Sequence, residues 1–242
     1  MCIPLRIGNG SAMTNYRVSE IVEDASELLD RVWSARKQVW GRDDVGLQQF
    51  LLEAPQAIIS HCFGMKLVPF QSDPAFPRMA GYVDFSAQTI GVRRDMRKEI
   101  QRFTLGHEIG HGRYHSKLQL CFRDLPLTGG ELASKDRPET EIVADRFSAE
   151  LLMPRGHVLD FIRIAWGTER LERDQLLAGA LTAGCARLVT KAEIQGSLER
   201  CLLLVASCEG SPRSGPKPSI AQWFGVSPTA MAIQLKELGV VR

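Results

Sequence analysis

The sequence predicts an α+β protein in which a small, partly antiparallel sheet packs on helices and a mainly helical C-terminal region follows. In two long stretches the apolar residues recur at steps of three and four, which is typical of helices that bury one face. Short runs rich in β-branched and aromatic residues lie between these stretches and indicate strands. The chain has 242 residues, 44% hydrophobic and 24% charged, which suits one large domain or one domain with a small appendage and excludes global disorder.

The first half of the chain is expected to contain two helices and the whole sheet. One helix should run from Ser19 to about Trp40, with Ser19 as its N-cap. A second should begin near Pro55, because proline suits the first turn of a helix, and should end near Phe63. The sheet is expected to consist of three strands, at 65–70, 80–85 and 89–92.

The second half is expected to be helical apart from one long loop. Helices are predicted from about 96 to 115 and from 139 to 153, and Pro154 closes the second of them. The loop between them, from 117 to 138, is rich in proline, glycine and charge. Beyond Gly156 the chain is again mainly helical, with fewer distinctive features.

A linker over 209–218, rich in proline and glycine, precedes a compact tail. In this tail Ser227 suits the N-cap of a last helix and Pro228 its first turn, so the tail has a helix-turn-helix outline. We therefore divide the chain into three parts, at 16–156, 157–208 and 219–242.

Charge and apolar content favour a cytoplasmic protein. Lys plus Arg number 30 and Asp plus Glu 28, a balance that does not make nucleic acid the default partner. A membrane span needs about 20 apolar residues and a secretory signal needs a shorter apolar core; we expect neither, whether the chain starts at Met1 or Met13. The six cysteines form no Cys-x-x-Cys pair and are expected to be reduced, with Cys201 and Cys208 as the pair to test otherwise.

The residues that indicate chemistry are His107, Glu108 and His111, which form a His-Glu-x-x-His motif on a predicted helix. Residues four apart lie about 6 Å apart along a helix and nearly on one face, so both imidazoles can bind one metal ion. Because the motif falls on an apolar stripe, both histidines should face inward. Glu108 follows the first histidine directly and can reach a water on the metal.

A second helix supplies carboxylates at the same spacing. Glu141 and Asp145 share a helix face that can lie opposite the histidines. Glu141 would then be the third metal ligand, with Glu139 as its rival. Asp145 would accept a hydrogen bond from the non-ligating nitrogen of one histidine and so fix its tautomer. The other interpretation of this pair is a solvated face with salt bridges.

His115 continues the histidine spacing, but eight residues of helix span about 12 Å, which is too far for one ion to reach both ends. We therefore expect His115 to be a packing or helix-end residue, and we do not expect His61 or His157 to be ligands. Tyr114, Tyr82 and His157 stay open as groups that could stabilise an oxyanion.

Two histidines and one carboxylate are the ligands of a catalytic zinc, which keeps its fourth position for water. Such a zinc ion lowers the pKa of its water to about 7 and polarises a carbonyl oxygen. Glu108 would accept the proton of the attacking water and pass it to a leaving amine. The motif therefore predicts metal-assisted hydrolysis, with a peptide bond as the expected substrate. Manganese and iron also suit these ligands.

Two segments of the chain resemble the ImmA/IrrE family of zinc metallopeptidases. They are Arg102-Phe-Thr-Leu-Gly-His-Glu-Ile-Gly-His111 and Glu141-Ile-Val-Ala-Asp-Arg-Phe-Ser-Ala-Glu-Leu-Leu-Met-Pro154. The segments that precede the first motif, from Pro55 to Val92, and the tail from Ile220 to Gly239 resemble the family as well.

The resemblance implies a zincin-like metallopeptidase core and a cytoplasmic bacterial or phage protein. It also implies a protein substrate, a DNA-binding helix-turn-helix repressor whose cleavage would relieve repression of a stress response or a mobile element. Carried over by position, His107, His111 and Glu141 bind the metal, Glu108 is the general base and Asp145 supports a ligand. The family often has Asn at position 145 and Ala where this chain has Ser148.

An alternative hypothesis is a non-enzymatic, metal-bound regulator whose helix-turn-helix-like tail binds DNA or a partner protein. Reading DNA requires basic residues for the phosphates and polar side chains for the base edges. From Glu209 to Arg242 the chain has four basic and two acidic residues, and the candidate recognition helix is mostly apolar apart from Gln234 and Lys236. Direct DNA binding is therefore not expected.

Overall fold

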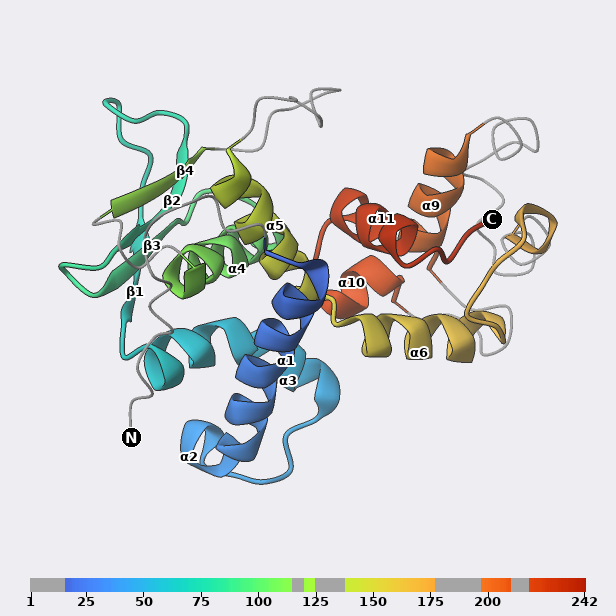
Figure 1. Ribbon diagram of the computed structural model, residues 1–242, viewed down its shortest axis with the longest axis horizontal. Coiled ribbons are helices and arrows are strands. Elements are labelled where there is room, and N and C mark those ends of the chain that lie inside the picture. The colour runs from blue at the N-terminus through green and yellow to red at the C-terminus, as the bar shows by residue number, and fades with distance from the viewer. Residues whose placement is uncertain (1–15, 115–119, 125–137, 177–196, 210–217) are drawn as a thin grey trace. The chain divides into compact units, whose positions relative to one another are not determined.

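The computed structural model describes residues 16–114, 120–124, 138–176, 197–209 and 218–242 (Figure 1). The chain divides into two compact units, Met1–Leu152 and Met153–Arg242. The first is a mixed α+β unit with a small sheet and the second, as far as it is described, is helical. The α+β class is therefore confirmed. The division of the chain into three parts, with boundaries at 156 and 208–219, stays a prediction.

Three helices open the first unit: α1 (Val18–Ser34), α2 (Arg36–Trp40) and α3 (Leu47–Ala57), the last continued by a π-helical turn, η1 (Ile58–Cys62). The single helix predicted from Ser19 to Trp40 is thus two helices, and the prediction of an unbroken one is wrong. At the break the Arg36 guanidinium donates to the Trp33 carbonyl (3.1 Å). Ser19 is not the N-cap, since α1 begins one residue before it; Arg17 holds that position and its N–H donates to the Glu20 carboxylate (3.0 Å).

Pro55 lies inside α3, so the prediction that it begins a helix is wrong. Proline has no N–H and therefore leaves the carbonyl four residues earlier, that of Leu51, without its helical donor. The guanidinium of Arg102 supplies the missing donor from another helix: it donates to the carbonyls of Leu51 (3.3 Å) and Leu52 (2.8 Å). A half-buried arginine thus makes a proline tolerable in the third turn of α3.

This arrangement predicts that Arg102→Met destabilises the protein by about 1–3 kcal/mol, the cost of a buried carbonyl left without a donor. Chemical denaturation of the two proteins measures it. In the Pro55→Ala background a backbone N–H is present at position 55, so the same change should cost less. An equal cost in both backgrounds would show that Arg102 does not act through the carbonyl that Pro55 leaves open.

The sheet has four strands in the order β1-β3-β2-β4: β1 (Lys66–Phe70), β2 (Met79–Asp84), β3 (Thr89–Arg93) and β4 (Leu120–Asp124). β1 runs parallel to β3, whereas β2 is antiparallel to both β3 and β4. The three predicted strands and their partly antiparallel pairing are confirmed. The fourth strand falls inside the loop predicted for 117–138, and there the prediction is wrong, because pairing with β2 extends the chain.

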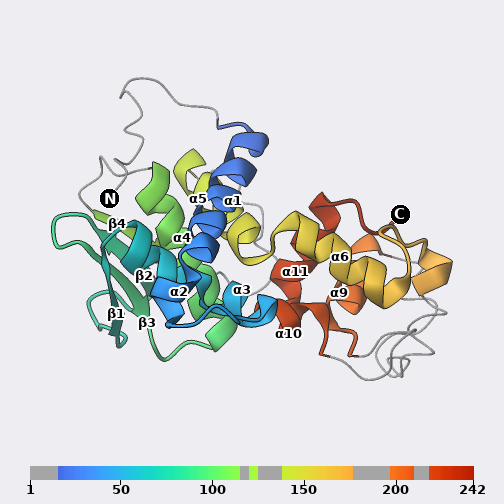
Figure 2. The ribbon, with the colours of Figure 1, turned by 90° about the horizontal axis from the view of Figure 1, so that it is seen from below.

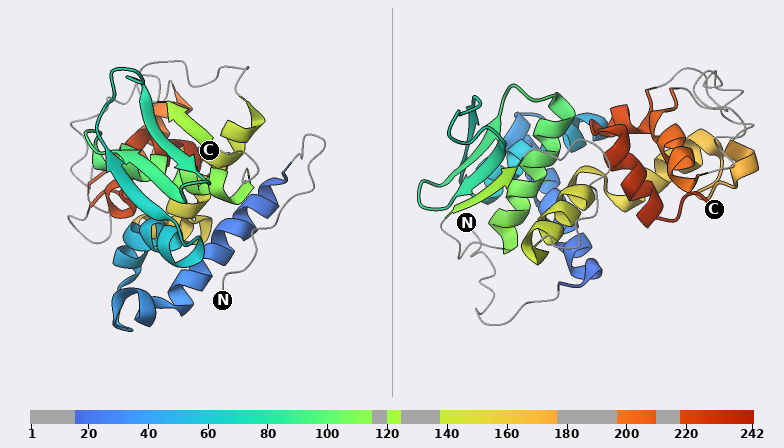
Figure 3. Two further views of the ribbon diagram at one scale, coloured as in Figure 1. Left: turned by 90° about the vertical axis from the view of Figure 1, so that its left-hand side faces the viewer. Right: turned by 90° about the horizontal axis from the view of Figure 1, so that it is seen from above.

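Behind the sheet lies α4 (Lys98–Tyr114), which packs on β2 and β3; Figure 3 (left) shows it behind the strands. On its other side α4 lies against α5 (Glu139–Leu152). The two helices touch where Gly106 meets Ser148 and Gly110 meets Ala144, so they are antiparallel and too close for a side chain at either glycine. Within the described residues both predicted helices are confirmed (Figure 2).

The second unit contains α6 (Arg155–Trp166), α9 (Leu198–Ser207), α10 (Ile220–Phe224) and α11 (Pro228–Glu237). The Ser227 hydroxyl accepts the Ala230 N–H at the start of α11, with Pro228 in the first turn, as predicted. Between α10 and α11, Gly225 has a left-handed backbone (φ 62°), which glycine adopts without strain. The helix-turn-helix-like character of this pair stays a prediction.

Some predictions fall outside the described residues: the role of His115, most of the 117–138 loop and of the 209–218 linker, and the start at Met1 or Met13. Cys62, Cys121 and Cys201 are buried thiols outside any disulfide, as expected. Cys208 is disulfide-bonded, so the expectation of a reduced thiol is wrong there, and its pairing with Cys201 is wrong as well. Among the helices of the described ranges, none combines the length and the apolar character that crossing a membrane requires.

Candidate metal centre

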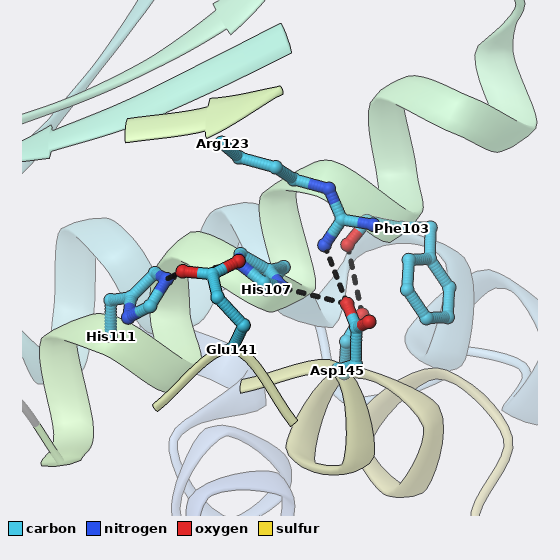
Figure 4. A network of polar contacts seen from close by, with 7 residues as sticks. Phe103, His107, His111, Arg123, Glu141 and Asp145 are labelled. Carbon is cyan, nitrogen blue, oxygen red and sulfur yellow. Dashed lines mark hydrogen bonds and ion pairs between the residues drawn. The ribbon is translucent and has the colours of Figure 1, made fainter. Parts of the chain in front are cut away.

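The inner face of α4 carries the three residues of the His-Glu-x-x-His motif. His107 and Glu108 are fully buried and His111 is 1% exposed, so the prediction that both imidazoles face inward is confirmed. Their Nε2 atoms lie 2.9 Å apart. The spacing of four residues on one helix thus brings two nitrogen donors to one point, as Figure 4 shows.

Glu141, in the first turn of α5, lies against both histidines (Figure 4). One of its carboxylate oxygens is 3.3 Å from the His107 Nε2 and the other is 3.1 Å from the His111 Nε2. Of the histidine, cysteine and acidic side chains that the structure describes, these three form the one group able to hold a metal ion, with ligand atoms within 4.8 Å of one another. Glu139, the rival ligand, is not part of it.

The chemistry of this triad fits a metal cation. Burial, with Arg123 nearby, lowers the pKa of His107, so its imidazole is held in the neutral form that binds metals. Burial alone would raise the pKa of Glu141, but the adjacent imidazoles of His107 and His111 outweigh burial and hold that pKa below its usual range. Two neutral imidazoles and one carboxylate are also the protein ligands of open, catalytic zinc sites.

One turn beyond Glu141, Asp145 reaches the far side of His107. Its Oδ1 lies 2.8 Å from the His107 Nδ1, the contact that the sequence predicted for it. Because a carboxylate accepts, this contact places the imidazole proton on Nδ1 and leaves the Nε2 lone pair facing the triad. Asp145 therefore selects the tautomer of His107 that can bind a metal.

Arg123 is a member of this network that the sequence did not reveal. It comes from β4 and its Nη1 donates to Oδ1 of Asp145 at 2.8 Å (Figure 4). The guanidinium also lies over the ring of Phe103, 5.2 Å from its centroid. Sequence analysis missed it because β4 was predicted as loop; the alternation of apolar residues over 118–122 is the signal that indicated a strand.

The carboxylate of Glu108 is fully buried, and neither of its oxygens has a hydrogen-bond partner in the described structure. Burial raises its pKa well above the usual range, and Arg123 opposes that rise. The opposing strand leaves room for it: a Cβ at Gly81 of β2 would lie 2.8 Å from the Glu108 Oε1. A buried carboxylate without partners is costly to keep, and such groups are concentrated at functional sites.

The three side chains considered for stabilising an oxyanion lie in different surroundings. The Tyr114 hydroxyl donates to Asp24 of α1 (2.9 Å), so its proton is already engaged. The Tyr82 ring packs against Phe70 in the sheet. His157 belongs to the second unit and His61 is exposed on η1; neither is a member of the triad, as expected.

The fold and this site are typical of metallopeptidases with a His-Glu-x-x-His helix, and the comparison with known families agrees. Residues 68–179 match the family model described as the IrrE N-terminal-like domain. This match supports an ImmA/IrrE family metallopeptidase, as the sequence motifs indicated. It covers most of the sheet, α4, α5 and α6 but does not extend to the tail at 219–242. No curated protein matches the chain significantly.

Proposed function

We propose that this protein is a zinc-dependent endopeptidase that hydrolyses a peptide bond in a cytoplasmic regulatory protein, namely a DNA-binding helix-turn-helix repressor. The observation that carries the proposal is the buried carboxylate of Glu108, which has no hydrogen-bond partner among the described residues and lies beside three side chains that could hold a metal ion. A structural metal site would not require such a group, whereas hydrolysis requires a base at this place.

In this proposal each residue of the site has a distinct task. His107, His111 and Glu141 hold the metal, zinc by preference, with manganese and iron as alternatives. When bound, the metal supplies a positive charge that activates a water and polarises the substrate carbonyl. Glu108 accepts the proton of the attacking water and delivers it to the leaving amine.

Both steps that Glu108 performs profit from its surroundings. Because its oxygens make no hydrogen bond within the described structure, they are available to the water and then to the amine. Burial raises the pKa of Glu108, which favours holding the proton between the two steps. Asp145 keeps His107 in its metal-binding tautomer throughout.

The alternative, a non-enzymatic regulator whose tail binds DNA, receives little support from the second unit. Gln234, one of the few polar residues of α11, is buried and donates to the carbonyl of Met153 (3.1 Å), so its amide does not face solvent where it could read a base. The exposed positions of α11 include the apolar Ile233 beside Lys236 and Glu237. We therefore propose a role for the tail in packing or in holding the protein substrate.

Metal removal tests the proposal. The purified protein is incubated with any helix-turn-helix repressor encoded beside its gene, and the products are identified by intact-mass spectrometry. We expect a single cut by the zinc-loaded protein, none after chelation, and recovery when zinc is restored, because the triad needs its ion to activate water.

The pattern of results separates the two functions. A cut that survives complete chelation would contradict the metallopeptidase assignment. An intact repressor with zinc bound, together with a mobility shift of duplex DNA that weakens steeply with salt, would favour the regulator instead.

A further inference from the structure

Arg123 is a buried cation that joins the three elements of the site. It stands on β4, donates to Asp145 on α5 and lies over Phe103 on α4, one turn before His107. The residue is 8% exposed. A guanidinium so far from water needs a carboxylate partner, and Asp145 is the one that the structure gives it.

The geometry at Asp145 is more specific than an ion pair. The Arg123 Nη1 and the His107 Nδ1 both approach the same oxygen, Oδ1, each at 2.8 Å. A carboxylate that faces one imidazole alone can rotate about its side chain, and it can present either oxygen. A second, charged donor on that oxygen fixes which oxygen faces His107 and at what angle.

The guanidinium itself is held in place from its other side. Its contact with the Phe103 ring, at 5.2 Å, is a cation–π interaction with the helix that also carries His107. This contact fixes the position of Arg123 relative to α4. Arg123 in turn orients the carboxylate of Asp145, on α5, toward α4.

We propose that Arg123 is a positioning residue for the metal: it aims Asp145 at the His107 Nδ1 and so keeps the His107 Nε2 directed at the ion. The inference rests on the proposed metal role of His107, His111 and Glu141. A merely structural salt bridge between β4 and α5 would use the same two side chains, so the test must separate metal affinity from stability.

The experiment measures the dissociation constant of zinc by competition with a chromophoric chelator, and the thermal midpoint of the metal-free protein. Arg123→Met is expected to weaken zinc binding about 10- to 100-fold, as changes at groups that orient a ligand typically do. Asp145→Ala, which removes the acceptor for the His107 Nδ1–H, should have a similar effect. The double variant should bind zinc about as weakly as Asp145→Ala alone, because Arg123 acts through Asp145.

Arg113 offers a matched control. Its side chain is as exposed as that of Arg123, 10% in both cases, and it also pairs with an aspartate, Asp24, but its ion pairs are with α1, at Asp24 and Glu27, and not with α5. Arg113→Met should therefore lower the thermal midpoint and leave zinc affinity unchanged. If Arg123→Met does not fold, Arg123→Lys takes its place, because lysine keeps the charge without the planar fork. We expect Arg123→Lys to bind zinc more weakly than wild type.

The outcomes separate this inference from the function on which it rests. A wild-type protein that binds no metal would overturn the proposed function itself. If wild type binds zinc and Arg123→Met or Arg123→Lys binds it equally well, the positioning role is wrong. It is also wrong if the effects of Arg123→Met and Asp145→Ala multiply as independent changes do.

Discussion

Glu108→Gln is expected to lower the rate of peptide-bond hydrolysis about 10²- to 10⁴-fold, the range that a positioned acid–base group contributes. Glutamine has the shape of glutamate but cannot accept a proton at neutral pH. Because Glu108 lies outside the triad, zinc binding should stay at one ion per chain. The variant should also be at least as stable as wild type, since it removes a buried carboxylate that has no hydrogen bond of its own.

Three measurements check this prediction: cleavage by intact mass, metal content by elemental analysis and the thermal midpoint. Glu150→Gln is the matched control, since Glu150 is also a buried glutamate (3% exposed) but lies nine residues beyond Glu141 on α5, about 13 Å along the helix. It should keep its activity. Full activity in Glu108→Gln would remove Glu108 from the mechanism, and lost zinc would make it a ligand instead of a base.

Gly110→Val should push α4 and α5 apart and so displace the metal-binding side chains of the site. A Cβ at Gly110 would lie 3.0 Å from the Ala144 Cα and 3.3 Å from the Phe147 ring, and valine adds two methyl groups beyond it. Overpacking of this kind costs about 1–3 kcal/mol of stability. The displaced segment of α5 carries Glu141 and Asp145, so we also expect zinc affinity to fall about tenfold or more.

Gly110→Ala distinguishes the two effects. Alanine favours a helix over glycine by about 1 kcal/mol, which offsets the milder clash, so stability should change little while zinc affinity still falls. As a control, a Cβ at Gly156 on α6 would have no neighbour within 4 Å, and Gly156→Ala should leave zinc affinity as it is. Undiminished zinc binding in Gly110→Val would show that the spacing of α4 and α5 does not set the ligand geometry.

Those parts of the site that lie on single helices could be predicted from the sequence. His107 and His111 face one way because they are four residues apart, and the same rule groups Glu141 with Asp145. That the two faces meet was an inference from chemistry, and the short distances from Glu141 to both imidazoles agree with it. Strands β2 and β3 were predictable for the same reason, since each has its own local pattern.

The parts that depend on distant contacts could not be predicted. Nothing near Arg123 in the sequence indicates that it faces Asp145, because β4 becomes a strand by pairing with β2. Pro55 is a comparable case: a proline normally marks a helix start, and it is tolerated inside α3 only because Arg102, far along the chain, supplies a donor. Local rules fail where a tertiary partner overrides them.

The arrangement of the triad also has a consequence for how long the protein lasts in a cell. Its ligands come from α4 and α5, and only the folded first unit holds these helices together. A metal ion whose free concentration is a hundred times its dissociation constant therefore adds about 2.7 kcal/mol to the free energy of unfolding. It lowers the unfolded population about a hundredfold. Degradation by cellular proteases follows that population. When zinc becomes scarce, the protein's turnover should accelerate and its abundance fall, so metal supply would set the amount of this protein as well as the proposed activity.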